Sequence, residues 1–140
     1  MSDFFSDDDF DHLRTNQTSW LPMHDVLRSS PKLELELRFI GEGNEDAERL
    51  RNNNAFRELS KKDNDQAADQ LLAKTVIVGW RNAVGKDGKE QQYAPALGVA
   101  LLEHLRRVKR RDLLNRIIIH ASTPEHFTAP VVDAGELGKP

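Results

Sequence analysis

One stretch of the chain alternates strictly between apolar and charged residues, and this alternation limits what the rest can fold into. Residues 32–39 read Lys-Leu-Glu-Leu-Glu-Leu-Arg-Phe. Successive side chains of a strand point to opposite faces, so the apolar ones share a face: Leu33, Leu35, Leu37 and Phe39. The pattern predicts a half-buried strand over about residues 32–40. The strand needs a pairing partner from elsewhere in the fold or from another protein chain. Because the chain offers only weak candidates, the sequence favours a neighbouring subunit or another bound protein.

Two helical segments are expected after the strand. The first begins at Asn44, a good N-cap followed by an acidic first turn, and runs to about Leu59 with a thin apolar stripe. The second begins after Asp63 and carries apolar residues at helical spacing as far as Trp80. The β-branched cluster at residues 75–78 lowers helix propensity, which leaves an extended end as the alternative.

Two further helices and a short turn complete the predicted domain. Residues 85–89 carry the Asp-Gly signature of a tight turn. A helix then opens at Pro95, where the missing N–H of proline is harmless, and ends in a basic run. Another starts at Asp112, and Pro124 opens a final turn that holds Phe127.

Together these elements predict a mainly α-helical fold of about four helices, with one minor β element and disordered tails. Residues 1–30 are expected to form a flexible acidic tail and a connector, because they lack an apolar period and contain a proline. Residues 31–127 are expected to form the helical domain. Residues 128–140, which are rich in Pro and Gly, are expected to be a second flexible tail.

The sequence contains no recognisable motif for catalysis, metal binding or cofactor binding. Cysteine is absent, so thiolate ligands and a Cys nucleophile are excluded. The five histidines do not show the helical i, i+4 spacing of a metal site, and no serine lies in a nucleophile elbow. The glycines at 79, 85 and 88 do not form a phosphate loop. We therefore expect no catalytic, cofactor-binding or metal-binding residue, and a protein that is not an enzyme.

The densest charge feature is a basic run after the Leu-rich helix, consisting of Arg106, Arg107, Lys109, Arg110 and Arg111. Three readings stay open: a solvated helix end, a patch for a protein partner, and a contact to nucleic acid, the last being least favoured because no aromatic residues are interleaved. The acidic segment at residues 3–11 complements the run in charge. One hypothesis is that this segment rests on the basic run, in the same or a neighbouring subunit.

An ordered set of short motifs resembles the tail assembly chaperones of long-tailed bacteriophages. These are Val-Ile-Val-Gly-Trp at residues 76–80, Asp-Gly-Lys at 87–89, and Tyr-Ala-Pro at 93–95 before a Leu-rich helix with a charged end. The resemblance covers about residues 31–127. Ala94 stands where the family pattern often has Ser or Thr, so a side-chain cap is lost there.

The resemblance implies a mostly helical, non-catalytic protein that binds the tape measure protein and recruits major tail protein subunits. Self-association and a longer frameshifted product are also implied. An apolar surface surrounded by charge fits such a role. The candidate client-facing residues are Leu33, Leu35, Leu37, Phe39, Val76, Val78 and Trp80.

Two other functions remain open at this point. The first alternative is a structural protein of the virion, such as a tail or head-to-tail connector component, in which the strand would complete a sheet in a ring of subunits. The second alternative is a regulator that binds nucleic acid through the basic run. Since neither a signal peptide nor a membrane span is recognisable, we expect the protein in the cytoplasm of the host cell, with no membrane partner.

Overall fold

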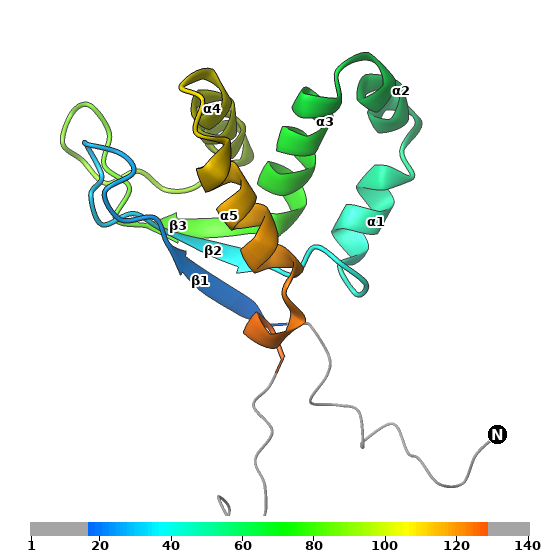
Figure 1. Cartoon of the computed structure of the whole chain (residues 1–140), viewed down its shortest axis with the longest axis horizontal. Helices are drawn as coiled ribbons and strands as arrows, with labels where there is room; N and C mark the ends of the chain where they lie inside the picture. Colours follow the sequence, from blue (N-terminus) through cyan, green and yellow to red (C-terminus); the bar gives the residue numbers. More distant parts are fainter. Residues whose placement is uncertain (1–16, 129–140) are drawn as a thin grey trace, which may run out of the picture.

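The computed structural model describes residues 17–128, which form five α-helices, a three-stranded antiparallel sheet and two tight helical turns. In chain order the elements are β1 (Thr18–Pro22), β2 (Glu34–Arg38), α1 (Glu45–Arg51), α2 (Asn54–Lys62), α3 (Asn64–Leu71), the π-helical turn η2 (Leu72–Val76), β3 (Ile77–Arg81), α4 (Pro95–Arg107), α5 (Arg111–Ser122) and the 3-10 turn η3 (Pro124–His126). Figure 1 shows the helices α1–α5 standing on one face of the sheet.

The strand β2 lies in the middle of the sheet. It pairs antiparallel with β1 on one side and with β3 on the other. In this register Leu35 lies between Leu21 of β1 and Trp80 of β3. The pairing with β3 is interrupted by a bulge at Val78, where the partner of Leu37 is Ile77 and that of Glu36 is Gly79.

The alternation of β2 is what places the hydrophobic core. Leu35 and Leu37 on its apolar face, and Leu33 just before it, have no exposed surface. They belong to one core cluster with residues of η2, α4 and α5 and with Phe127, which follows η3. The largest fully buried side chains of the core are Phe127, Met23, Leu33, Leu35, Leu37, Ile77, Leu102, Leu105, Ile117 and Val76. The opposite face of the sheet is polar, with Arg81 ion-paired to Glu34 and its guanidinium 4.0 Å from the ring centre of Trp20.

The prediction of a mainly α-helical fold with one minor strand is wrong, because the protein has a mixed α/β fold. Both partners of β2 come from this chain. The first, β1, lies in the segment that was expected to be a tail and connector. The second, β3, is the end of the second predicted helix, where the β-branched residues Val76, Ile77 and Val78 favour extended backbone.

The helix predictions fare better than the strand predictions. Asn44 caps α1 through a hydrogen bond from the Ala47 N–H, and Pro95 opens α4, as expected. The first predicted helix is split, because Asn53 accepts a hydrogen bond from the Phe56 N–H and so starts α2 anew. The tight turn at 85–89 is present, with Gly88 at a φ of 77°.

No helix within residues 17–128 has the length and apolar character needed to span a membrane. The acidic segment 3–11 and most of the predicted tail at 128–140 lie outside the described residues.

Candidate protein-interaction surface

The strand residues predicted to face a client lie in the core. Leu33, Leu35 and Leu37 have no exposed surface, because β1 and β3 pair with their strand and the helices cover their face. Phe39, just beyond the strand, is half-buried, and its ring lies 5.8 Å from that of Phe127. In this fold the three leucines are therefore not available to a partner.

The second predicted client-facing segment is divided between core and surface. Val76 is fully buried, whereas Val78 is 40% exposed at the bulge of β3. Trp80 is half-buried: its ring meets Tyr93 edge-on at 5.1 Å, and its Nε1–H donates to the Gln91 carbonyl at 2.8 Å. These contacts tie β3 to the segment before α4, so the Trp-containing motif and the Tyr-Ala-Pro motif meet in space.

Tyr93 completes this contact between β3 and α4. Its hydroxyl donates to the Ala73 carbonyl of η2, and burial raises the pKa of the phenol, so it stays protonated. Gly98 of α4 leaves room for the phenol, since a Cβ at that position would collide with the Tyr93 hydroxyl. The motif residues thus serve to pack helix against strand, and the tyrosine is a structural group.

The basic run at 106–111 is largely neutralised by acids of α3 and α5. Arg106 is held by Asp69, with Nε 3.0 Å from Oδ1, and by Asp65 at 3.0 Å. Arg110 forms a bidentate ion pair with Asp112, with its Nε 2.9 Å from Oδ1 and its Nη2 3.0 Å from Oδ2. Arg111 lies 3.6 Å from Asp65, which leaves Arg107 and Lys109 without an ion pair among the described residues. This balance weighs against a strongly cationic surface for nucleic acid.

The Asp69–Arg106 pair is a buried joint between α3 and α4. The Asp69 side chain is 2% exposed and that of Arg106 is 15% exposed. Burial raises the pKa of Asp69, and the hydrogen bonds from Arg106 oppose that rise without cancelling it. The pair therefore holds two helices together at a desolvation cost, and removing only one partner would leave a buried charge.

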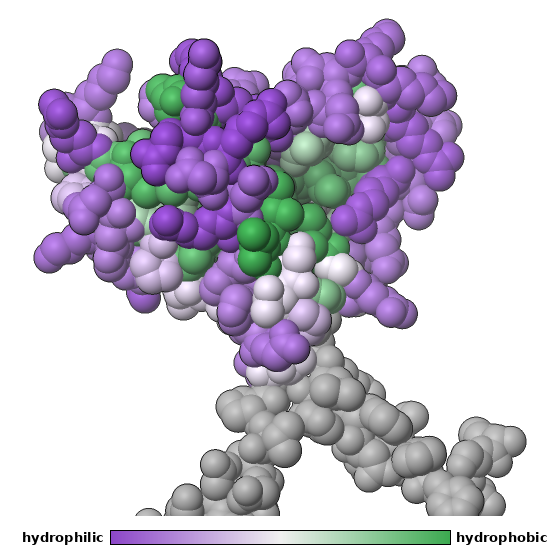
Figure 2. Space-filling view, viewed as in Figure 1, coloured by the Kyte–Doolittle hydropathy of each residue, from purple (hydrophilic) through white to green (hydrophobic). Residues whose placement is uncertain are grey.

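The helices α1, α2 and α3 are here called the helical lobe, and its first two helices bury much less than the sheet and α4–α5 do. None of the residues of α2 is buried, and the only buried residue of α1 is Ala47. Several apolar side chains of the lobe are half-buried and lie outside the main core cluster: Leu50, Phe56, Leu59 and Leu71. Figure 2 shows a hollow between α5 and the lobe with apolar atoms along it and hydrophilic side chains around it.

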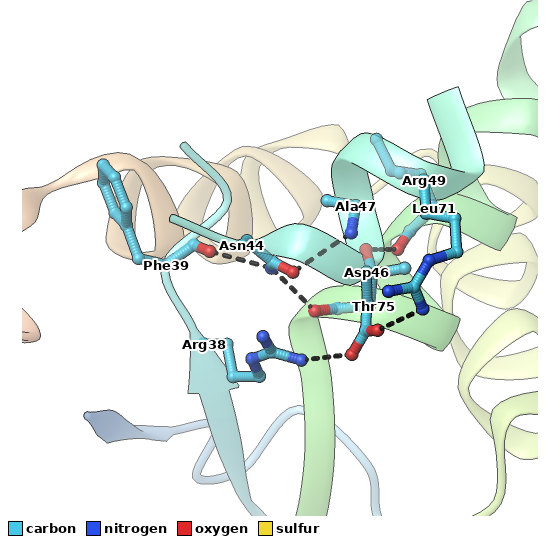
Figure 3. A network of polar contacts seen from close by, with 8 residues as sticks. All are labelled: Arg38, Phe39, Asn44, Asp46, Ala47, Arg49, Leu71 and Thr75. Carbon is cyan, nitrogen blue, oxygen red and sulfur yellow. Dashed lines mark hydrogen bonds and ion pairs between the residues drawn. The ribbon is translucent and has the colours of Figure 1, made fainter. Parts of the chain in front are cut away.

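Asn44 links the lobe to the rest of the molecule (Figure 3). Its Nδ2 donates to the carbonyls of Phe39 and Thr75, both at 2.9 Å, while its Oδ1 caps α1. Beside it Asp46 pairs with Arg38 of β2 at 2.7 Å, and this contact lowers the pKa of Asp46. One asparagine therefore satisfies polar groups from the sheet, η2 and the lobe.

The helical lobe is a candidate surface whose residues are not among the binding residues predicted from the sequence. Its signal was the narrow stripe of Leu50, Phe56 and Leu59, which is too thin to bury a helix fully. Within residues 17–128 no three His, Asp or Glu side chains are grouped to hold a metal ion.

Neither a curated protein nor a solved structure matches the chain. Residues 42–135, more than half of the chain, match the family described as YdaY prophage protein, and the match spans every helix from α1 to α5. The chain therefore belongs to the YdaY prophage protein family and is phage-derived.

Proposed function

We propose that this protein is a non-catalytic tail assembly chaperone, which binds the tape measure protein and recruits tail tube subunits in the host cytoplasm. The observation that carries the proposal is a partly exposed apolar surface on a loosely packed helical lobe, in a protein of a prophage family. Apolar surface that is rimmed by charge and outside the core is typical of sites that bind other polypeptides. The motif resemblance supplies the specific clients.

The lobe is a suitable place for such binding for a physical reason. Because α2 buries no residue completely, moving it away from α3 exposes little additional apolar area and so costs little free energy. An apolar helix of a client could pack against Leu50, Phe56 and Leu59 in the manner of a helix in a groove. The fully buried leucines of β2 are left out of this proposal.

Co-expression with the tape measure protein of the same phage tests the proposal. We expect the tape measure protein to stay soluble and to copurify with the wild-type chain. A Leu59→Asp variant should lower the recovered complex roughly tenfold, as expected for the loss of one central apolar contact. Leu97→Asp is the control, since it makes the same substitution on α4, outside the lobe, at a leucine that is 37% exposed.

Equal recovery with Leu59→Asp and with wild type would contradict binding through the lobe. Tape measure protein that aggregates whether or not the chain is present would contradict the chaperone role itself.

A structural protein of the virion is the second candidate, and the sheet favours it in one respect. Both β1 and β3 are edge strands, which are able to pair with a strand of another chain. The bulge at Val78 and Pro22 at the end of β1 both hinder such pairing. Mass spectrometry of purified particles separates the two functions, because a structural protein is abundant in mature virions and a chaperone is not.

A further inference from the structure

Two arginines of the helical lobe have no acidic partner among the described residues, although other cations of the lobe are ion-paired. Within residues 17–128, Arg51 and Arg57 form no ion pair and donate only to neutral oxygens. Arg51 reaches the Ile40 carbonyl at 3.4 Å, and Arg57 reaches the Arg51 carbonyl at 3.4 Å. Lys61 is paired only with Glu58, at 3.4 Å. The corner between α1 and α2 therefore carries a net positive charge.

These cations border a groove with an aromatic side chain in it. The groove has a volume of about 630 Å³ and is lined by Arg51, Asn54, Phe56, Arg57, Glu58, Ser60 and Lys61. Phe56 is half-buried there, so part of its ring is open to a ligand. A site of this composition favours a ligand that combines aromatic rings with carboxylates, since rings cover the apolar part and carboxylates meet the guanidinium groups.

A segment of that chemistry exists in the same chain. Residues 3–11 read Asp-Phe-Phe-Ser-Asp-Asp-Asp-Phe-Asp, five carboxylates interleaved with three aromatic rings, and contain no basic residue. Charge complementarity alone would also have matched this segment to the basic run. However, the basic run has three acids against it, Asp65, Asp69 and Asp112, and it lacks an aromatic residue. The α1–α2 groove contains a single acid, which is already paired with a lysine, and it has the ring of Phe56.

We propose that the groove between α1 and α2 is a binding site for an acidic aromatic peptide, and that residues 3–11 of this protein are its occupant. Phe4 and Phe5 or Phe10 pack against Phe56, and the aspartates pair with Arg51 and Arg57. The site is filled from the same chain or from a second copy. The proposal does not depend on the chaperone role, but Phe56 belongs to both proposed surfaces, so the segment and a client helix would compete for it.

Engineered cysteines test the proposal directly, because the natural chain contains none. Ser60 lines the groove, so a full-length Ser6→Cys, Ser60→Cys variant should form a disulfide rapidly under mild oxidation. The comparison variant is Ser6→Cys, Lys109→Cys, which places the second thiol in the basic run instead. We expect the groove pair to cross-link roughly tenfold faster at low salt, and to lose most of this advantage near 1 M salt.

Charge reversal provides the second arm. Arg51→Glu together with Arg57→Glu should slow cross-linking of the groove pair roughly fivefold, whereas Arg107→Glu together with Lys109→Glu should leave it unchanged. All four residues are exposed, so the fold should tolerate these changes. A cross-linked monomer and a cross-linked dimer both support the proposal and distinguish the two sources of the segment. Equal rates for the two cysteine pairs, or indifference to charge reversal at Arg51 and Arg57, would overturn it.

Discussion

The sheet with α4 and α5 differs from the helical lobe in what holds it together. The first region packs fully buried leucines, isoleucines and phenylalanine around β2. The lobe instead depends on side-chain caps, namely Asn44, Asn53 and Asp63, and on half-buried apolar residues. The difference shows that one part of a small domain can provide most of its stability while another part presents an apolar surface that opens at a low cost in free energy.

The joint between the two regions gives the largest expected effect. Replacing Arg106 with methionine removes the cation that faces the buried Asp69 carboxylate, so the variant should lose about 3–5 kcal/mol of unfolding free energy. Urea denaturation followed by circular dichroism measures it. The control is Arg107→Met, which changes an exposed neighbour without an ion pair and should stay within about 0.5 kcal/mol of wild type. Similar losses in both variants would mean that the pair does not fasten the lobe.

The contrast in packing predicts unequal costs for the same kind of truncation. Leu35→Ala empties a site with no exposed surface in the core and should cost about 3 kcal/mol. Leu59→Ala in the half-buried stripe of α2 should cost about 1 kcal/mol or less. The same denaturation measurement compares them, and equal losses would show that the lobe belongs to the core.

The two asparagine caps offer a sharper comparison within the lobe. Asn44→Ala should cost about 2 kcal/mol, because it removes the cap of α1 and leaves two carbonyls without their donor. Asn53→Ala removes only an exposed cap and should cost about 1 kcal/mol. If thermal unfolding ranks the two equally, Asn44 acts as a simple cap and does not link the lobe to the sheet.

The smallest expected effect concerns two stacked histidines, one near the end of α5 and one in η3. The rings of His120 and His126 lie 4.0 Å apart, and burial followed by repulsion from His126 lowers the pKa of His120. Since its pKa is about 6.5 in the unfolded chain, the unfolded state binds the proton more readily, and stability falls as the pH drops below about 6.5. The urea midpoint should be slightly lower at pH 5.5 than at pH 7.5, and His120→Gln should reduce that difference. An unchanged difference in the variant would assign it to other groups.

Much of the helical structure was predictable, because its signals are local. Asn44 caps a helix and Pro95 opens one through effects on neighbouring backbone groups, and the structure confirms both predicted helix starts. The strands that pair with β2 could not be predicted in the same way, because strand pairing depends on residues that are distant in sequence. In addition, β1 and β3 are each only five residues long. Likewise, the basic run looks cationic in sequence, and only the fold brings Asp65 and Asp69 of α3 against it.

Amide hydrogen exchange of the full-length protein tests most directly whether the helical lobe opens locally at a lower free-energy cost than the core. We expect the amides of α2 to exchange by local opening at least a hundredfold faster than those of β2 and α5, with α1 between them, while β2 exchanges only through global unfolding. Uniform protection across α2, β2 and α5 would contradict the division and, with it, the proposed surface for a client.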